Sequence, residues 1–327
     1  MGLTTGLKLI TYRYIQVGMI MTQRILYILV PDTHISPFDV TLAADAGFTQ
    51  ILPFTGIKAD DVISMVQDAI FARPPKRFND TGIFLGGRDV HLATDMFQNA
   101  KKAMVGPFQV GVFADPNGAY TTSASIVALV EQALGKKTGH GLKGRKVSVF
   151  GTGPVGLCTA VLAAQQGAEA KLCQLTADDD RGVARRFCER YSVSVEWVSA
   201  QTHLEKARAL KETEVIICAA KAGIRILGKE ELDFAEHALV AADTNAVPPT
   251  GIEGVEANDK YKPVEMAKST FWGIGSLAIG NLKYKTQYGL FVKMQQSEKS
   301  ALLDFRDAYN FAISELHGTE LKQEDAA

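Results

Sequence analysis

The chain has 327 residues, of which 46% are hydrophobic and 22% charged, and its formal net charge is −1. At roughly 100–200 residues per domain, this length predicts two domains, and the ordinary composition excludes disordered, collagen-like and low-complexity proteins. The balance of 35 basic and 36 acidic side chains provides no overall field for a polyanion. We therefore expect neither nucleic acid nor a membrane as a partner.

The first twenty residues are expected to lie outside the fold. They contain no apolar run long enough for a signal peptide or a membrane span. A second methionine, Met21, directly precedes the apolar segment 22–30, which is typical of a first strand. Residues 1–20 are thus predicted to form a disordered extension.

The four cysteines predict neither a metal site nor disulfides. They form no CxxC pair and fall in one α/β region of the sequence: Cys158, Cys173, Cys188 and Cys218. Thiols in apolar strands usually behave as small buried hydrophobic groups. This usage favours a cytoplasmic protein.

Strand and helix signals alternate through the first part of the chain. Short apolar runs predict strands at 25–30, 51–54, 81–85 and 108–113, and periodic or capped segments predict helices at 39–46, 61–70, 91–104 and 121–134. This alternation indicates a mostly parallel sheet, in which ligands bind beyond the carboxyl ends of the strands. Two polar turns fall there, Gly86-Gly87-Arg88-Asp89 and Asp115-Pro116-Asn117-Gly118.

The clearest motif is the glycine-rich turn Gly151-Thr152-Gly153-Pro154-Val155-Gly156, between a strand at 146–150 and a helix at 157–166. The first glycine permits the tight turn, the second lets a pyrophosphate approach the backbone, and the third lets helix and strand pack closely. The N–H groups at the helix start would hold the phosphates. We predict that these six residues bind a dinucleotide; a tight turn without a ligand is the alternative.

The next strand, 168–175, leaves the cofactor open as NAD or NADP. An acidic residue at its end would bind the ribose hydroxyl and an arginine would suit a 2′-phosphate, but Gln174 and Leu175 stand there. Residues 178–180 are acidic, yet they could equally cap a helix at 181–191. Further strands are predicted at 195–198, 214–219 and 239–242, and the turns after them would bring Ala219, Ala220 and Asn245 to the cofactor.

These elements predict a two-domain α/β fold. Residues 139–275 would form a Rossmann-type, doubly wound parallel sheet that binds NAD(P), and residues 21–138 with 276–327 an α/β substrate domain. A Gly/Lys linker is expected at 135–144, and a glycine-spaced apolar run at 271–282. Residues 286–316 are expected to form one C-terminal helix that returns to the first domain.

Five segments occur as an ordered series: FLGGRD at 84–89, ADPNGAYTTSAS at 114–125, VFGTGPVGL at 149–157, ADTNAVPPTGIEG at 242–254 and AIGNLKYK at 278–285. From about residue 21 to residue 316, the chain resembles the bacterial NAD(P)-dependent methylene-tetrahydromethanopterin dehydrogenases of methylotrophs. The resemblance implies oxidation of methylene-tetrahydromethanopterin to its methenyl cation, in one-carbon flow from formaldehyde. It also favours a homo-oligomer.

The resemblance further implies that Lys283, in the IG-x-LK pattern, lines the pterin pocket. Leu175-Thr176 stand where the NADP-specific branch has an Arg-Lys pair, which favours NAD, alone or alongside NADP. Other Rossmann oxidoreductases, such as a methylene-tetrahydrofolate dehydrogenase or a relative of shikimate dehydrogenase, and a non-catalytic nucleotide sensor are the alternatives.

The implied chemistry needs positioning more than acid–base groups, because two nitrogens flank the methylene and their lone pairs expel the hydride. We expect Lys283 to hold the pterin, with Asp115 and Asp243 as its partners or as stabilisers of the positive charge. The remaining expected substrate contacts are Gly87, Asp89, Asn117, Thr121 and Thr122. Each has an ordinary alternative: Asp115 could hold its turn, the threonines could cap a helix, and Lys283 could be solvated.

Overall fold

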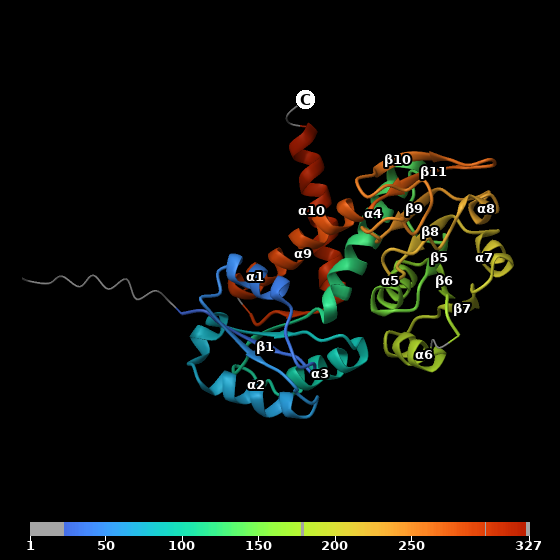
Figure 1. Ribbon diagram of the computed structural model, residues 1–327. Coiled ribbons are helices and arrows are strands. Elements are labelled where there is room, and N and C mark those ends of the chain that lie inside the picture. Colours follow the sequence, from blue (N-terminus) through green and yellow to red (C-terminus); the bar gives the residue numbers. More distant parts are fainter. Residues whose placement is uncertain (1–22, 178–179, 298, 325–327) are drawn as a thin grey trace, which may run out of the picture.

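The computed structural model describes residues 23–177, 180–297 and 299–324, with side chains described through residue 318 (Figure 1). The predicted extension at 1–20 lies outside these residues. Two sheets organise the chain, with strand orders β12-β4-β3-β1-β2 and β10-β11-β9-β8-β5-β6-β7. The α/β class with a doubly wound parallel sheet is confirmed.

The first sheet is entirely parallel and comes from both ends of the chain. Its strands are β1 (Ile25–Leu29), β2 (Gln50–Phe54), β3 (Thr81–Leu85), β4 (Gly111–Ala114) and β12 (Leu302–Leu303). The connecting helices are α1 (Pro37–Asp45), α2 (Asp61–Phe71) and α3 (Val90–Lys102), with short 3₁₀ turns η1 (Pro75–Asp80) and η2 (Pro116–Gly118). The strand predicted at 108–113 starts later, because Val105 and Phe108 instead close a tight turn on each other.

The second sheet is parallel except for one edge hairpin. Its strands are β5 (Lys146–Phe150), β6 (Glu169–Gln174), β7 (Glu196–Ser199), β8 (Val215–Cys218), β9 (Val240–Asp243), β10 (Lys260–Glu265) and β11 (Thr270–Ile274). Its helices are α5 (Pro154–Gln165), α6 (Arg181–Arg190), α7 (His203–Leu210) and α8 (Lys229–Leu232). The antiparallel pair of β10 and β11 was not predicted, because β10 is polar, largely exposed and interrupted by Pro263, as an edge strand can be.

Two long helices connect the sheets: α4 (Ala119–Thr138) leads out of the first and α9 (Ser276–Gln296) leads back, between the two sheets in Figure 1. The linker predicted at 135–144 is wrong in its first part. The helix continues through Thr138 and ends at Gly139, whose φ of 77° places it in the left-handed region that glycine adopts readily.

The single helix predicted at 286–316 is also wrong. The backbone is extended at Ser297, β12 pairs with β4, and a separate helix, α10 (Phe305–Glu324), follows. The apolar run at 271–282 likewise divides into β11 and the start of α9. Register with β4 at the sheet edge explains the break, and short apolar runs do not distinguish helix from strand.

Helix α9 completes the core of the first sheet. Its Phe291 is fully buried, and its ring centroid lies 5.3 Å from those of Phe84 and Phe113 and 6.1 Å from that of Phe48. The same helix begins directly after β11 of the second sheet. Within the described residues, no helix combines the length and apolarity needed to cross a membrane.

Candidate active site

The glycine-rich loop between β5 and α5 is shaped by close backbone approach. A Cβ on Gly151 would lie 2.7 Å from the carbonyl oxygen of Ala219, and one on Gly156 would lie 1.9 Å from the carbonyl oxygen of Gly151. A Cβ on Gly153, by contrast, would meet no atom within 4 Å. The loop is therefore packed on its inner side and open at Gly153, which is the cradle that a pyrophosphate requires.

Some of the other predicted cofactor residues lie in or beside this loop, and others make contacts within the region of the second sheet. Thr152, Pro154 and Val155 are half-buried in the loop itself, and Ala219 and Ala220 abut Gly151. Leu175 packs against a buried hydrophobic cluster of the second sheet that includes Phe150 and Cys173. Gln174 donates from Nε2 to the Thr176 carbonyl oxygen at 2.8 Å and accepts from Trp197 Nε1 at 3.2 Å, so its amide bonds within the chain.

Among the acidic residues after β6, Asp180 caps α6. Its carboxylate accepts from the backbone N–H groups of Gly182 and Val183. Residues 178 and 179 are not described. The capping alternative therefore holds for Asp180.

Asp243 and Asn245 hold a loop onto the ends of β8 and β9. Asp243 accepts from the backbone N–H groups of Asn245 and Ile252, both at 3.0 Å, while Asn245 accepts from Gly223 N at 3.0 Å. Burial raises the pKa of Asp243, against these hydrogen bonds. The carboxylates whose charge acts on Lys283 are instead Asp115 and Asp39, so Asp243 is not placed as its partner.

Lys283 lies against the turn that follows β4. A Cβ on Gly118 would be 3.4 Å from Lys283 Nζ, and the ammonium sits 3.5 Å from the ring centroid of Phe38. Nζ donates to Gln287 Oε1 at 2.6 Å. Burial lowers the pKa of Lys283, and the charges of Asp115 and Asp39 oppose that shift. The solvated-lysine alternative is therefore not what the structure has.

Asp115 is fully buried beneath the same turn. It accepts from the backbone N–H groups of Tyr120 and Thr121 and from Thr121 Oγ1, the last at 2.6 Å. Burial raises its pKa, while Lys283 and these hydrogen bonds lower it. Asp115 thus holds the turn and also contributes its charge to the surroundings of Lys283.

Other predicted substrate contacts belong to this turn or to the start of α4. Asn117 is exposed and has a φ of 50°, in the left-handed region. Thr121 is buried on Asp115, and Thr122 is half-buried, with Oγ1 3.9 Å from a Cβ on Gly118. A non-glycine residue in this backbone region is often associated with a functional site.

We call Lys283 and the residues around it, Asp115, Phe38, Asp39 and Gln287, the Lys283 cluster. The last three of these were not predicted. Gln287 Nε2 donates to Asp39 Oδ1 at 2.6 Å. Burial, aided by the charge of Asp115, raises the pKa of Asp39 to about 6. Gln287 follows Lys283 by one helical turn and could have been found from that spacing, whereas no sequence signal joins either to Asp39.

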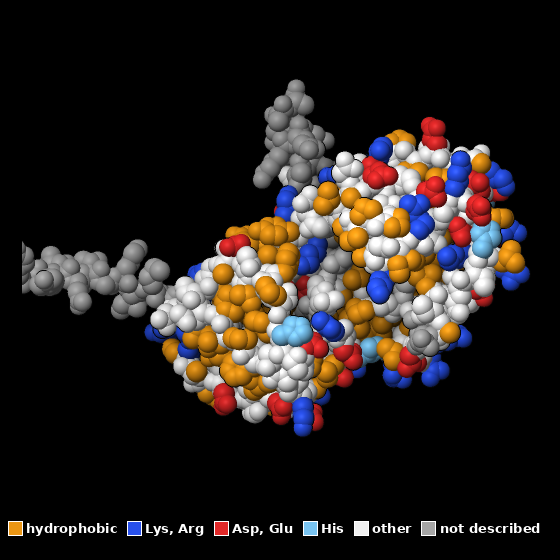
Figure 2. All heavy atoms as spheres, viewed as in Figure 1, with side chains coloured by type: hydrophobic (Ala, Val, Ile, Leu, Met, Phe, Trp, Pro, Cys, Tyr) orange, Lys and Arg blue, Asp and Glu red, His pale blue; other side chains and the backbone are white. Residues whose placement is uncertain are grey.

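A cavity of about 730 Å³ separates the first sheet from the glycine-rich loop. One wall carries Arg88 and Asp89, and the other carries Thr152, Pro154 and Arg186. Figure 2 shows the hollow between the two lobes, with charged side chains of both signs at its rim. The structure thus brings the turn after β3 to face the predicted cofactor loop.

The predicted substrate residues Gly87 and Asp89 shape this wall. A Cβ on Gly87, where φ is 102°, would lie 2.7 Å from Pro31 Cδ. The Asp89 carboxylate caps α3, accepting from the backbone N–H groups of His91 and Leu92.

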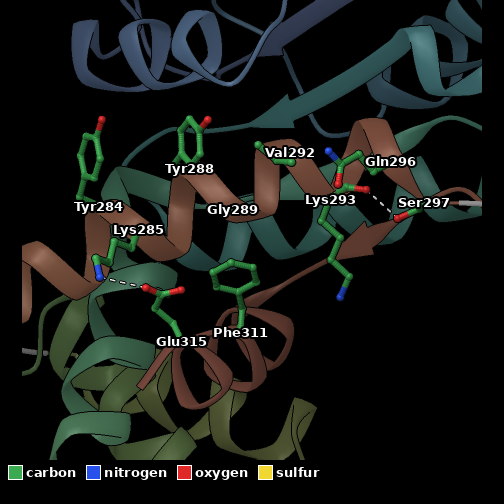
Figure 3. Close-up of a pocket in the computed structure, with 10 residues that line it drawn as sticks. All are labelled: Tyr284, Lys285, Tyr288, Gly289, Val292, Lys293, Gln296, Ser297, Phe311 and Glu315. Carbon is green, nitrogen blue, oxygen red and sulfur yellow. Dashed lines mark hydrogen bonds and ion pairs between the residues drawn. The ribbon is translucent and has the colours of Figure 1, made fainter. Parts of the chain in front are cut away.

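A second cavity, of about 570 Å³, lies between α9 and α10 (Figure 3). Lys285 forms an ion pair with Glu315 at 2.9 Å, and Gly289 packs against Phe311. Tyr284 and Tyr288 are exposed and point away from α10 in Figure 3. Among the described residues, no group of three or more His, Cys, Asp or Glu side chains is arranged for a metal, and the four cysteines are buried and free.

A family model and a curated relative indicate one family. The family model described as "Methylene-tetrahydromethanopterin dehydrogenase, N-terminal" matches residues 37–117. The NAD(P)-dependent methylenetetrahydromethanopterin dehydrogenase of Methylorubrum extorquens is 42% identical over 297 residues, covering 90% of this chain and 99% of that protein. The bifunctional protein MdtA of the same organism is 33% identical over 293 residues, covering 89% and 99%.

Two solved structures have a related fold. The NAD-dependent malic enzyme of Thermotoga maritima has a TM-score of 0.53 at 14% identity, covering 89% of this chain and 85% of that one. Shikimate 5-dehydrogenase of Listeria monocytogenes, solved with shikimate and NAD, has a TM-score of 0.50 at 12% identity, covering 90% and 97%. At such identities the likeness concerns the fold alone.

Proposed function

This chain belongs to the family of NAD(P)-dependent methylene-tetrahydromethanopterin dehydrogenases, and we propose that it transfers hydride from methylene-tetrahydromethanopterin to NAD(P), giving the methenyl cation in one-carbon metabolism. One observation on the structure supports this activity in addition to the membership of the family. The turn after β3 faces the open glycine-rich loop across the cleft, and the turn after the neighbouring parallel strand β4, against which Lys283 lies, is at the same carboxyl edge of the first sheet.

The cofactor loop fits NAD or NADP. Gly151 and Gly156 permit the close backbone packing, and the open side of Gly153 leaves room for the pyrophosphate. The N-terminus of α5, where Pro154 takes the first helical position, supplies unpaired N–H groups. When bound there, the nicotinamide accepts the hydride; the absence of an acidic residue at Gln174-Leu175 suits either cofactor.

The chain's own residues contribute position and charge. Orientation of two reactants can lower a barrier by roughly 7–11 kcal/mol. Lys283 offers three N–H donors, of which one bonds Gln287, and the others are suited to a polar edge of the pterin. Two carboxylates, Asp39 and Asp115, surround this one ammonium, so the cluster favours a cationic product.

Around this centre, we assign the substrate contacts to the wall of the cleft. Asn117 and Thr122 would contact the pterin from the turn beside Lys283, while Thr121 fixes Asp115. Gly87 and Asp89 would set the shape of the wall opposite Thr152. In this assignment Asp243 and Asn245 act on the cofactor side only, by holding their loop.

We assign the substrate half to residues 21–138 with 276–327 and the cofactor half to 139–275, and we propose a cytoplasmic homo-oligomer. Tyr284 and Tyr288, exposed by 44% and 38%, give α9 an aromatic surface suited to a second copy. Sedimentation velocity tests this part: a purely monomeric protein at micromolar concentration would contradict it.

The activity is tested by following the near-ultraviolet absorbance of the reduced nicotinamide. Methylene-tetrahydromethanopterin and methylene-tetrahydrofolate are each paired with NAD and with NADP. We expect the greatest rate with the methanopterin carrier. No reduction with that carrier and either nucleotide would contradict the proposal, and a preference for the folate would reassign the substrate.

A further inference from the structure

A buried chain of hydrogen bonds ends on Lys283. The Asp39 carboxylate accepts from Gln287 Nε2 at 2.6 Å, and Gln287 Oε1 accepts from Lys283 Nζ at 2.6 Å. Gln287 has no exposed surface, and Asp39 is only 7% exposed. The chain joins α1 to α9 beside the turn that holds Gly118.

The chemistry of the three groups gives this chain a direction. An ionised carboxylate only accepts hydrogen bonds, and an ammonium only donates them. The amide between them must therefore turn Nε2 to Asp39 and Oε1 to Lys283. Loss of the charge at Asp39 weakens the charge-assisted hydrogen bond that anchors this amide, although Asp39 lies two hydrogen bonds away from the ammonium.

We infer that Asp39 is a positioning residue, which acts through the amide of Gln287 to fix the ammonium of Lys283 against the Gly118 turn. The inference rests on the proposed function, because Lys283 is the proposed contact to the pterin. It adds two residues that the sequence motifs do not contain.

The arrangement depends on pH. The charged groups that act on Asp39 are Asp115, from the turn before α4, and Lys283, from α9. Burial raises the pKa of Asp39 to about 6. Below this pH the neutral acid accepts the Gln287 N–H in a weaker hydrogen bond, so Gln287 and with it the Lys283 ammonium are held less firmly and kcat/KM falls.

The test compares Asp39→Asn with Asp45→Asn, an exposed aspartate on the same helix. Asp39→Asn keeps the shape but presents an amide, and we expect kcat/KM to fall by about 10- to 100-fold, as misplacement of a reacting partner does. The fall of kcat/KM near pH 6 disappears in Asp39→Asn and persists in Asp45→Asn. Equal kinetics for the two variants would overturn the inference.

A double variant separates positioning from a purely structural role. If Asp39 acts through Lys283, Asp39→Asn costs nothing further once Lys283→Met is present. A structural defect would instead reduce the activity of Lys283→Met by the same factor as it reduces that of the wild type, and that additive result contradicts the inference.

A measurement without substrate keeps the two proposals distinguishable. An amine-reactive reagent, followed by mass spectrometry, reports the labelling rate of Lys283. We expect faster labelling in Asp39→Asn than in Asp45→Asn, because loss of the carboxylate charge lowers the pKa of Lys283 further. An inactive wild type with this labelling difference would reject the proposed function alone, and equal labelling would reject the inference.

Discussion

The cofactor loop and the Lys283 cluster are built in opposite ways. The loop uses backbone packing within six consecutive residues, and its essential contacts lie between Gly151, Gly156 and one neighbouring turn at Ala219. The cluster uses side chains from α1, the turn after β4 and α9. A site formed by backbone packing can thus be local in sequence, whereas a site formed by side chains depends on how helices that are distant in sequence pack together.

The largest expected effect is on the loop. In Gly156→Ala the new Cβ would lie 1.9 Å from a backbone oxygen, which has no flexible end to move away. We expect destabilisation by about 1–3 kcal/mol and loss of NAD(P)H binding. Urea unfolding and fluorescence titration with NADH measure the two effects.

Gly153→Ala is the matched control for Gly156→Ala. Its Cβ meets no atom within 4 Å, so the stability should be unchanged while cofactor affinity falls. If Gly153→Ala bound NADH as the wild type does, the open side of the loop would not be the pyrophosphate site.

Lys283→Met tests whether the two regions act separately. We expect kcat/KM for the pterin to fall by about 100-fold. The affinity for NADH should stay within about twofold, because the cofactor loop does not contact the cluster. Titration and steady-state kinetics on the same preparation measure both quantities. A parallel loss of NADH affinity would show that the cofactor loop and the Lys283 cluster do not act separately.

The pKa of Asp39 predicts how stability depends on pH. Burial raises it from 3.8 to about 6, so between these values the folded protein holds more protons than the unfolded chain. The free energy of unfolding therefore falls as the pH rises through this window, by at most about 3 kcal/mol from this group. Asp39→Asn lacks this contribution.

Urea unfolding of Asp39→Asn and the wild type at several pH values provides the measurement. The free energy of unfolding of the variant, relative to that of the wild type, should increase from pH 4 to pH 6 and stay constant above pH 6. A constant difference across the window would mean that Asp39 does not titrate there.

The smallest effect concerns Asn117. Its φ of 50° costs backbone energy, and Asn117→Gly should raise the free energy of unfolding by less than about 1 kcal/mol. Ser192, with a φ of 54° after α6, is the control, since Ser192→Gly should give a similar gain without any change in KM. A KM for the pterin that is unchanged in Asn117→Gly would remove Asn117 from the substrate contacts.

Much of the fold follows from the sequence, because hydrophobic period and glycine placement act locally. The strands at 81–85 and 146–150 match β3 and β5 in their bounds, and the helix at 181–191 matches α6 to one residue. The errors fall where tertiary contacts decide: the break at Ser297 exists because β12 pairs with β4, and the polar β10 is held only by β11.

The site divides in the same way. Asp115 and Lys283 could be selected from motifs, but Asp39 stands 248 positions from Gln287, and only the packing of α1 on α9 joins them. Asp243 illustrates the converse. Its motif is conspicuous in sequence, yet the carboxylate is occupied by the backbone of its own loop.

The position of Phe291 has a consequence for the order of synthesis. The first four strands leave the ribosome long before α9. Phe84 and Phe113 therefore lack their contact with the ring of Phe291 while the whole second sheet is made. At ordinary elongation rates that interval is on the order of ten seconds. Until α9 has been made, the nascent chain therefore carries Phe84 and Phe113 without the ring of Phe291 against them.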